Sequence, residues 1–516
     1  MGNSNFSSVE LNLFASRIGA ICEEMGALLG RVAFSPNIRD RLDYSCALFC
    51  HQGYLLGQAT HIPVHLGSMA HAMVDLASSR QWRPGDMLIL NDPYRGGTHL
   101  PDITLVAPVF SGSELVGFCA NRAHHADIGS DAPGSMPVSS LLEEEGLLIP
   151  PTLLIKNNSV DEDFLQAILS RLTNPDTSRG DFNAQIAANL LGVERLQALV
   201  GTSGLTGFRQ LQSGLQSWAG NLAGGSLAVI PDGVYFFEDY LDDDGYGQTD
   251  ITIKVSIKIS RGRADLDFSG TSRQVKGNLN CPMPVTAAAV VYVFRCLMPA
   301  HLPACHGAFQ GINISAPEGC LVNASAPAAV AAGNVETSSR IVDVVCGALS
   351  KAIPDKIPAA SQGTMNNLAM GSRGVNGWDY YETLAGGMGA SFDSNGCSAR
   401  HSHMTNTLNT PIEVLELNYP LRIDRYAIRK GSGGDGEFQG GNGVVRQYSF
   451  LADAEVSLLT ERRRLQPWGL KGGGAGECGV NELDGNEIPG KICFKATAGQ
   501  TLTIKTPGGG GMGSSQ

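Results

Sequence analysis

Residues 85–129 read GDMLILNDPYRGGTHLPDITLVAPVFSGSELVGFCANRAHHADIG. Apolar runs at 87–90, 103–110 and 115–121 have the length of buried strands, and the small turn Ser111-Gly112-Ser113 joins the last two as a hairpin. One polar loop, 91–102, precedes the hairpin and a second, 121–129, follows it. Because one hairpin joins the two loops, we expect their polar side chains to lie on the same side of the sheet.

These two loops concentrate histidine and aspartate. His99 and Asp102 lie in the first loop, and His124, His125 and Asp127 lie in the second. Imidazole and carboxylate groups suit Zn²⁺, Mn²⁺ or Fe²⁺, and the lack of thiolates argues against a purely structural zinc. A lone histidine more often bonds to loop backbone, but this grouping predicts a divalent-metal site.

Two nearby positions bear on that site. Pro101 keeps the preceding residues out of a regular helix, so Asp102 is expected on a turn, outside any core strand. Asp43 stands at the mouth of a strand predicted at 43–54. A carboxylate there is as often a cap as a metal ligand, and the residues alone leave both interpretations open.

His61 and His65 are four residues apart. The spacing resembles a zinc-binding helical pair, but Pro63 interrupts the helix and the glutamate of an H-E-x-x-H motif is missing. We therefore interpret His65 as lining a pocket and His61 as structural.

The segment Asn334-Val335-Glu336-Thr337-Ser338 begins a helix predicted at 335–352. Its polar groups could bind substrate. Ordinary helix capping is the favoured interpretation of such a start. Asn334 and Glu336, together with His65, are nevertheless the substrate-binding candidates. The polar stretches 362–367 and 401–407 could touch a ligand or satisfy loop backbone.

Hydrophobic periodicity indicates the fold class. Helical spacing recurs at 9–35, 65–79, 161–172, 181–201, 207–221 and 284–296. Period-two alternation begins near 233 and predicts an antiparallel sheet, and short strands between glycine turns fill the last hundred residues. The sequence therefore predicts a multidomain α+β protein. Its predicted parts are a metal-binding α/β region with a helical extension at 1–225, a sheet-plus-helix region at 226–400 and a glycine-rich β region at 401–516.

Composition excludes several classes of function. The net charge is −12, so the basic footprint of a nucleic-acid-binding protein is missing. No stretch approaches the roughly 18 apolar residues of a membrane span, and the N-terminus lacks the pattern of a secretory signal. Its start superficially fits a myristoylation pattern, which gains no support elsewhere. The twelve cysteines form no C-x-x-C pair and indicate reduced thiols in a cytoplasmic protein.

Glycine is abundant, at 64 residues, with clusters at 431–443, 469–476 and 508–513. None of these clusters continues into the Gly-Lys-Ser/Thr of a phosphate-binding loop or has the strand–helix context of a dinucleotide fingerprint. The chain is therefore expected to carry no ATP site of its own.

Six ordered motifs give the sequence its resemblance to a known family, hydantoinase B/oxoprolinase. They are Asn91-Asp92-Pro93-Tyr94…Gly97-Thr98-His99-Leu100-Pro101-Asp102, His124-His125-Ala126-Asp127-Ile128-Gly129, Gly333-Asn334-Val335-Glu336-Thr337-Ser338, Pro358-Ala359-Ala360-Ser361-Gln362-Gly363-Thr364-Met365-Asn366-Asn367, Thr405-Asn406-Thr407…Asn409-Thr410-Pro411-Ile412-Glu413 and Thr506-Pro507-Gly508-Gly509-Gly510-Gly511. Members work with an A-type, ATP-binding partner, separate or fused. They open 5-oxoproline, hydantoins or other lactams, and ketone carboxylases are relatives.

The resemblance implies a B-type chain in which Asp43, His99, Asp102 and His124 bind a divalent metal, with Zn or Mn the first candidates. His125 and Asp127 would then orient ligands or relay protons. An A-type partner would bind ATP-Mg and phosphorylate the carbonyl of a small cyclic amide, in an assembly with two copies of each chain. The metal would hold water or bicarbonate. A ketone carboxylase component is the alternative function, and a non-catalytic metal-binding scaffold is a second one.

Overall fold

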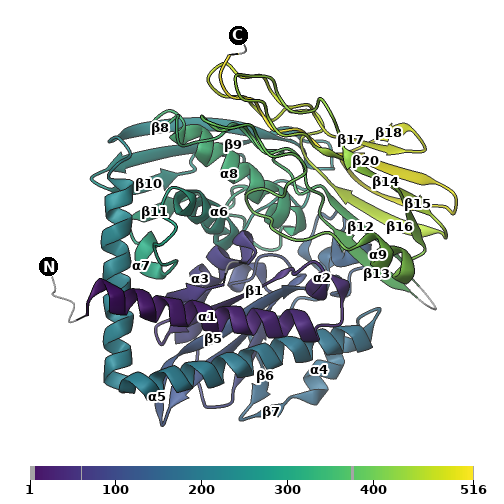
Figure 1. The fold of residues 1–516 in the computed structure, drawn as a ribbon. Helices are drawn as coiled ribbons and strands as arrows, with labels where there is room; N and C mark the ends of the chain where they lie inside the picture. The colour runs from purple at the N-terminus through teal and green to yellow at the C-terminus, as the bar shows by residue number, and fades with distance from the viewer. Residues whose placement is uncertain (1–5, 60, 374–376, 515–516) are drawn as a thin grey trace.

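The computed structural model describes residues 6–59, 61–373 and 377–514, which form four β-sheets with helices packed around and between them (Figure 1). Antiparallel sheets combined with separate helical layers confirm the predicted α+β class. Gly2, the acceptor of the myristoylation-like pattern, lies outside the described residues.

The N-terminal sheet is antiparallel, with the order β2-β1-β5-β4-β3-β6-β7. Its strands are β1 (Tyr44–Cys50), β2 (Leu55–Gln58), β3 (Met87–Leu90), β4 (Asp102–Ser111), β5 (Glu114–His124), β6 (Thr152–Lys156) and β7 (Ser159–Val160). The predicted hairpin is β4–β5, and its register pairs Asp102 with His124. The hairpin prediction is confirmed, and the two polar loops lie together at the same end of the strands.

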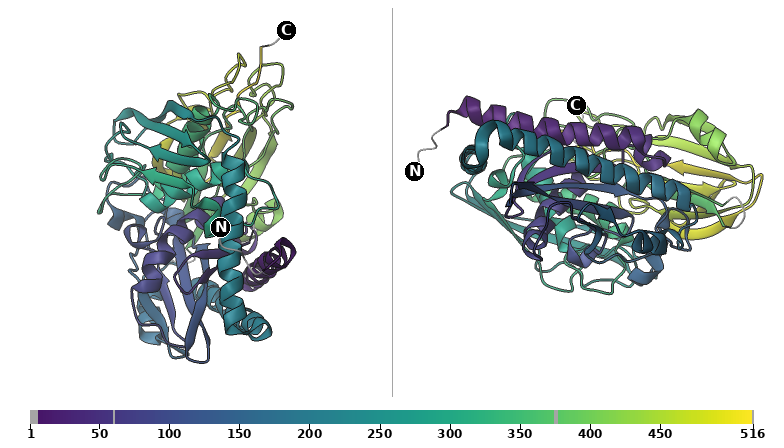
Figure 2. Two further views of the ribbon diagram at one scale, coloured as in Figure 1. Left: turned by 90° about the vertical axis from the view of Figure 1, so that its left-hand side faces the viewer. Right: turned by 90° about the horizontal axis from the view of Figure 1, so that it is seen from below.

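Helices cover both faces of this sheet (Figures 1 and 2). α1 (Ser8–Val32) and α5 (Pro175–Leu227) lie side by side on one face, and α3 (Pro63–Ser78) covers the other. Along β1, Leu48 packs in the cluster that contains α1, whereas Phe49 packs with α3, because successive strand side chains point to opposite faces. The sheet is therefore buried on both sides.

The helices predicted at 181–201 and 207–221 are the two halves of α5. They meet at Gly204, whose φ of 67° lies in the left-handed region that glycine adopts freely. The chain turns a corner there, and the second half of α5 runs up along the central region (Figure 1).

The central sheet has the order β11-β10-β9-β8. Its strands are β8 (Gly233–Asp243), β9 (Thr249–Ser260), β10 (Arg263–Asp267) and β11 (Ile312–Ser315), of which β10 and β11 are parallel. α6 (Met283–Cys296) packs against α3, and α8 (Ser338–Leu349) packs against β8 and β9. A single π-helical turn, η4 (Gly333–Thr337), leads into α8. Such turns interrupt helices mostly at functional sites.

Two sheets form the C-terminal part. One has the order β13-β12-β16-β19 and the other the order β14-β15-β20-β17-β18. Their strands are β12 (Asn367–Ser372), β13 (Trp378–Glu382), β14 (Leu421–Ile428), β15 (Val444–Phe450), β16 (Ala454–Leu459), β17 (Val480–Leu483), β18 (Asn486–Ile488), β19 (Lys491–Ala496) and β20 (Thr501–Lys505). The first sheet draws strands from both sides of the boundary proposed at 400/401, and the three-part division stays a prediction.

Short helices complete the described chain: α2 (Pro36–Arg39), η1 (Pro93–Arg95), η2 (Pro133–Ser135), η3 (Leu142–Glu145), α4 (Glu162–Leu169), α7 (His306–Phe309) and α9 (Ile412–Asn418). Across residues 6–59, 61–373 and 377–514, none of the helices combines the length and hydropathy that a membrane crossing requires. All twelve cysteines fall within the described residues and are free thiols, most of them buried.

The three glycine clusters come together near the C-terminus as extended, hydrogen-bonded segments. Gly434 N–H donates to Gly509 O at 2.8 Å, and Gly511 N–H donates to Gly474 O at 2.9 Å. A Cβ atom on Gly440 would lie 1.9 Å from the Gly509 carbonyl oxygen. Glycine is required here because one backbone packs directly on another.

Candidate metal centre

A group of imidazole and carboxylate side chains surrounds the start of β4. Asp102 Oδ1 lies 3.2 Å from His99 Nε2 and 3.3 Å from His124 Nδ1. Potential ligand atoms of these three residues all lie within 4.8 Å of one another, and all three side chains are buried. The structure thus brings together three of the four residues that the family resemblance assigned to a metal.

Local structure explains this convergence. The Asp102 amide donates to the His99 carbonyl at 3.1 Å, which closes the turn that Pro101 enforces. His124 is the last residue of β5 and pairs directly with Asp102 across the hairpin. The placement of Asp102 outside the core strands is wrong, because it begins β4 and its exposed fraction is 0%. The strand starts one residue before its apolar run because the register with His124 extends that far.

Unpartnered atoms test whether these residues fit a metal ion. His99 Nε2, Asp102 Oδ1 and His124 Nε2 are buried and make no well-oriented hydrogen bond, although His99 Nε2 and Asp102 Oδ1 lie within 3.2 Å of each other. A buried polar atom without a partner costs about 1–3 kcal/mol, so such atoms are rare unless a ligand satisfies them. Two imidazoles and one carboxylate form a donor set that suits Zn²⁺, Mn²⁺ or Fe²⁺. The residues present therefore fit a divalent ion.

Asp43 and His65 stand beside this group. His65, in the first turn of α3, places Nε2 3.3 Å from Asp102 Oδ2 and 3.9 Å from Asp43 Oδ1. The Asp43 carbonyl also accepts the His124 amide at 3.0 Å. With His124, the two residues line a cavity of about 20 Å³, which is room for about one water molecule. The Asp43 carboxylate thus faces the cluster, and both interpretations of it, as a cap and as a metal ligand, stay predictions.

Outer contacts fix the orientation of each group. His99 Nδ1 donates to the Ala331 carbonyl at 3.3 Å, so Nε2 is the ring nitrogen that faces Asp102. Asp102 Oδ2 accepts hydrogen bonds from Thr98 Oγ1 at 2.5 Å and Asn334 Nδ2 at 3.3 Å. The His124 ring stacks on Tyr381, with centroids 4.7 Å apart and planes 10° apart. Such partners orient metal ligands.

Electrostatics follow from these contacts. Burial alone would raise the pKa of Asp102, but the imidazoles of His99 and His65 offset it and hold the pKa of that carboxyl well below its usual range. For His99, burial is likewise offset by the Asp102 carboxylate, which raises its pKa. Burial lowers the pKa of His124. The site therefore keeps one carboxylate charged in a buried place.

The structure does not bring His125 and Asp127 into the cluster. His125 Nε2 donates to Gln185 Oε1 at 2.9 Å, on the α5 side of the sheet. The alternation of strand side chains turns it away from its neighbour His124. The Asp127 carboxylate accepts the Thr173 amide at 2.6 Å and the Asn174 amide at 3.1 Å, which ties two loops together.

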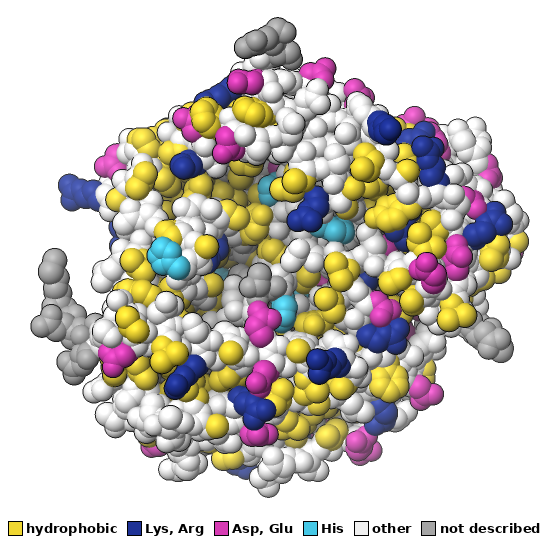
Figure 3. All heavy atoms as spheres, in the orientation of Figure 1, with side chains coloured by type: hydrophobic (Ala, Val, Ile, Leu, Met, Phe, Trp, Pro, Cys, Tyr) yellow, Lys and Arg dark blue, Asp and Glu magenta, His cyan; other side chains and the backbone are white. Residues whose placement is uncertain are grey.

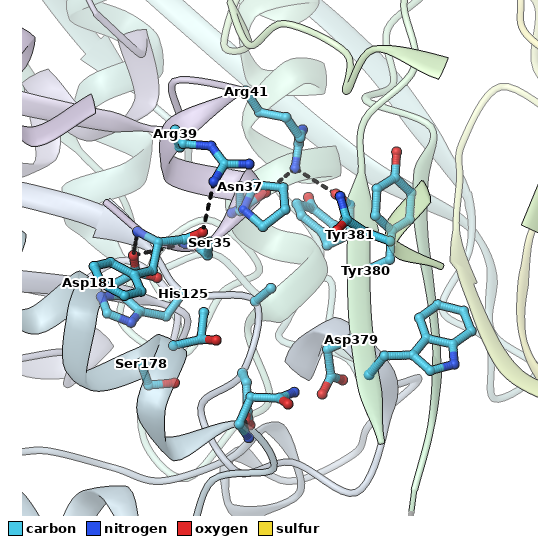
Figure 4. Close-up of a pocket in the computed structure, with 18 of the residues that line it drawn as sticks. Ser35, Asn37, Arg39, Arg41, His125, Ser178, Asp181, Asp379, Tyr380 and Tyr381 are labelled. Atoms are coloured by element: carbon cyan, nitrogen blue, oxygen red, sulfur yellow. Dashed lines mark hydrogen bonds between the residues drawn. The ribbon is translucent and has the colours of Figure 1, made fainter. Parts of the chain in front are cut away.

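His125 and Asp127 line a separate pocket of about 280 Å³ (Figure 4). Arg41 and Tyr381 form one of its walls, and Arg41 donates to the Tyr381 carbonyl at 2.8 Å. Tyr381 also lines the small cavity at the cluster, so this residue separates the two spaces. Sequence reasoning missed Tyr381, which comes from β13 and has no local motif.

The substrate-binding candidates have different surroundings. Asn334 contacts Asp102 directly, as described above. Glu336 is linked to the cluster through two other residues: its Oε1 accepts Asn367 Nδ2 at 2.6 Å, and Asn367 Oδ1 accepts the hydroxyl of Tyr381, which stacks on His124, at 2.7 Å. Burial, opposed by a hydrogen bond to Thr364, raises the pKa of Glu336 to about 7. From the two other polar stretches, Met365, Thr405 and Thr407 line the cavity at the cluster.

The contacts of His61 fit the structural role that we interpreted from the sequence. Its Nδ1 accepts the Cys46 amide at 3.3 Å, and its ring packs edge-on against Tyr44. It also lines a mostly apolar pocket of about 230 Å³ between α3 and α6, at a hollow in the face drawn in Figure 3. Pro63 lines that pocket, whereas Ile62 and Val64 line the cavity at the cluster. One layer of chain therefore separates the hollow from the candidate metal centre.

Fold and site together give a buried His–Asp–His group that could hold a metal ion, at the open end of the β4–β5 hairpin. The chain belongs to the hydantoinase B/oxoprolinase family, whose pattern it matches over residues 7–515. It is 38% identical to the 5-oxoprolinase of Dictyostelium discoideum over 98% of its own length, but it spans only 40% of that relative's length.

Shorter relatives match nearly end to end. The chain is 30% identical to a Pseudomonas protein named as the B-type component of a D-/L-hydantoinase, covering 96% of this chain and 88% of that protein. The crystal structure of an ATP-dependent caprolactamase from Pseudomonas jessenii superposes with a TM-score of 0.92 at 27% identity, covering 99% and 92% of the two chains. An acetone carboxylase structure shares the fold, with a TM-score of 0.87 at 19% identity over 98% and 75%.

Proposed function

We propose that this chain is the metal-binding subunit of an ATP-dependent cyclic amidohydrolase that opens 5-oxoproline, hydantoin or a similar lactam. The observation that carries the proposal is the buried group of His99, Asp102 and His124 with unpartnered ligand atoms. The names of the relatives supply the reaction class, since a 5-oxoprolinase, a hydantoinase component and a caprolactamase all act on cyclic amides.

Lactam opening is difficult because amide resonance must be lost. Phosphorylation of the carbonyl oxygen by a partner would make the carbon electrophilic. A bound divalent ion would lower the pKa of a water molecule and polarise the substrate oxygen. The chain's own residues would hold Asp102 through Thr98 and Asn334, beside a cavity of about 20 Å³.

The ATP site is assigned to a second chain. The glycine clusters here pack on one another's backbones, and this packing supports the assignment. The Pseudomonas relative is named as one component of a hydantoinase, and the Dictyostelium oxoprolinase is long enough to contain a further unit. We propose a cytoplasmic assembly with an A-type, ATP-Mg-binding partner, with two copies of each chain. Co-expression followed by size-exclusion chromatography should give one complex, and free monomers would contradict this.

A coupled ATPase screen of the co-expressed pair tests the function. We expect cyclic amides to stimulate ATP hydrolysis and the product mass to rise by one water. Stimulation by ketones alone, with bicarbonate present and a product heavier by one carboxyl group, would establish the alternative, a ketone carboxylase. Turnover that requires the chain but survives replacement of His99 would indicate a scaffold.

A further inference from the structure

One backbone segment touches two members of the cluster. In residues 328–334, the Ala331 carbonyl accepts from His99 Nδ1 at 3.3 Å, and the Asn334 side chain donates to Asp102 Oδ2 at 3.3 Å. The segment is buried, and it approaches the cluster from outside the N-terminal sheet. Whatever holds this segment therefore helps to orient both His99 and Asp102.

A buried carboxylate holds it. Glu145, at the end of η3, accepts the Val330 and Ala331 amides on a single oxygen, Oε1, each at 2.9 Å. The same oxygen accepts Ser139 Oγ at 2.8 Å, and the residue has an exposed fraction of 0%. Burial raises the pKa of Glu145 to about 7, and Oε1 accepts these hydrogen bonds whether or not the other oxygen, Oε2, carries a proton. Their convergence on one atom makes Glu145 an anchor for the turn at Ala331.

We propose that Glu145 is a positioning residue of the metal centre: by anchoring the amides of Val330 and Ala331, it fixes the carbonyl that orients the His99 ring. The carbonyl can only accept, so His99 must carry a proton on Nδ1, and Nε2 is the nitrogen that faces Asp102 and is available to a metal ion. Tyr94 and Asn280 also hold the segment, through the Ala328 and Ala329 carbonyls, so loss of the anchor would loosen the turn at Ala331 and the His99 ring without releasing the whole segment. This inference rests on the proposed function, because it assumes that the cluster binds metal.

The chain offers a matched control in Asp86. This buried carboxylate also accepts two backbone amides, from Arg83 at 3.0 Å and Asn157 at 3.2 Å. It precedes β3, and neither amide belongs to a residue that contacts the cluster. Loss of Asp86 should destabilise the fold by a similar mechanism without reaching the metal.

The experiment measures zinc affinity by chelator competition in the full chain, for wild type, Glu145→Ala, Glu145→Gln and Asp86→Ala. Loss of an outer partner of a metal ligand typically costs 10–100-fold in affinity, and we expect a loss of about that size for Glu145→Ala. Glu145→Gln should rescue most of it, because its Oε1 can still accept both amides. Asp86→Ala should lower the melting temperature while zinc affinity stays at the wild-type value.

Each of the other possible results contradicts either this inference or the proposed function. Equal zinc affinity in wild type and Glu145→Ala overturns the inference alone, whereas a wild-type chain that binds no zinc overturns the proposed function. Equal losses in Glu145→Ala and Asp86→Ala would show general loosening and also overturn it. If Glu145→Ala does not fold, the Glu145→Asp variant is measured in its place. Its side chain is one methylene shorter, so its carboxylate lies farther from the Val330 and Ala331 amides. Unchanged affinity in that variant counts against the inference.

Discussion

Two of the buried groups of charged side chains, one around Arg462 and one around Asp102, differ in the kind of atom that has no hydrogen-bond partner. Around Arg462, the guanidinium Nη2 lies 2.8 Å from Asp239 and 2.7 Å from Asp343. Unpartnered atoms in this network, such as Arg462 Nε, are cationic donors that cannot bind a metal. Around Asp102, the unpartnered atoms include imidazole nitrogens and a carboxylate oxygen, which offer lone pairs.

Burial of charge therefore does not by itself mark a functional site. The Arg462 network joins α8 and β8 to the C-terminal part, and each of its two aspartates, Asp239 and Asp343, is paired with an arginine. The Asp102 cluster has more histidines than its one central carboxylate can satisfy, which is the arrangement that a divalent ion would complete. The following variants compare the effects of changes in these two regions on activity and stability.

Asp102→Asn should have the largest effect on function. The change keeps the shape but removes the central negative charge, so we expect lactam-dependent ATP hydrolysis of the complex to fall on the order of a hundredfold or more. Because Asp102 is buried, activity must be normalised to folded protein. Asp239→Asn in the Arg462 network is the control, and it should leave activity per folded molecule nearly intact. Similar losses of activity in Asp102→Asn and Asp239→Asn would contradict the functional difference between the two regions.

Arg462→Ala should have the largest effect on stability. The change leaves Asp239 and Asp343 with only the more distant guanidinium of Arg340, 3.8 and 3.6 Å away. Removing one partner of a buried ion pair costs about 3–5 kcal/mol in the free energy of unfolding. Urea unfolding measures this loss, and zinc content per folded chain should not change. A variant that keeps its stability but loses zinc would contradict our assignment of roles.

The pH dependence of stability tests Glu336, which lies between the two regions. Its folded pKa of about 7 exceeds the unfolded value of about 4.3, so the folded state holds the proton more tightly. Its contribution to stability is present below the unfolded pKa and is lost as pH rises to about 7. Glu336→Gln should therefore be more stable than wild type at pH 8, by up to about 3 kcal/mol, and similar at pH 4. Parallel pH profiles would contradict this.

His125→Gln should have the smallest effect. His125 donates to Gln185 away from the cluster, and a lost hydrogen bond of this kind costs about 0.5–1.5 kcal/mol. We expect slightly lower thermal stability with zinc content and activity per molecule retained. A large loss of activity with zinc still bound would support the proton relay that the family resemblance implied.

How far the sequence predicted this structure depends on whether the signal was local. The hairpin and the meeting of its polar loops followed from apolar runs and turn residues, and they are confirmed. Tyr381 and the Ala331 carbonyl reach the cluster from distant segments, one through an aromatic face and one through backbone, so no local pattern could reveal them. Asp102 was misplaced because Pro101 masks the start of the strand that pairing with His124 extends.

The glycine clusters show a similar limit. The sequence could exclude a nucleotide loop from the residues that follow each cluster. It could not show that Gly440 packs against Gly509. Close backbone contact between distant segments requires glycine at both positions, but the sequence does not say which glycines meet. Likewise, the break in α5 was visible as a gap between two helical patterns, but the corner at Gly204 depends on its φ angle.

The most direct test of the central claim is the metal content of the purified chain, measured by elemental analysis after mild dialysis. Our account predicts about one divalent ion per chain in wild type and in Arg462→Ala, and loss of that ion in a His99→Ala, His124→Ala double variant. A wild-type chain without stoichiometric metal, or a double variant that keeps it, would contradict the account.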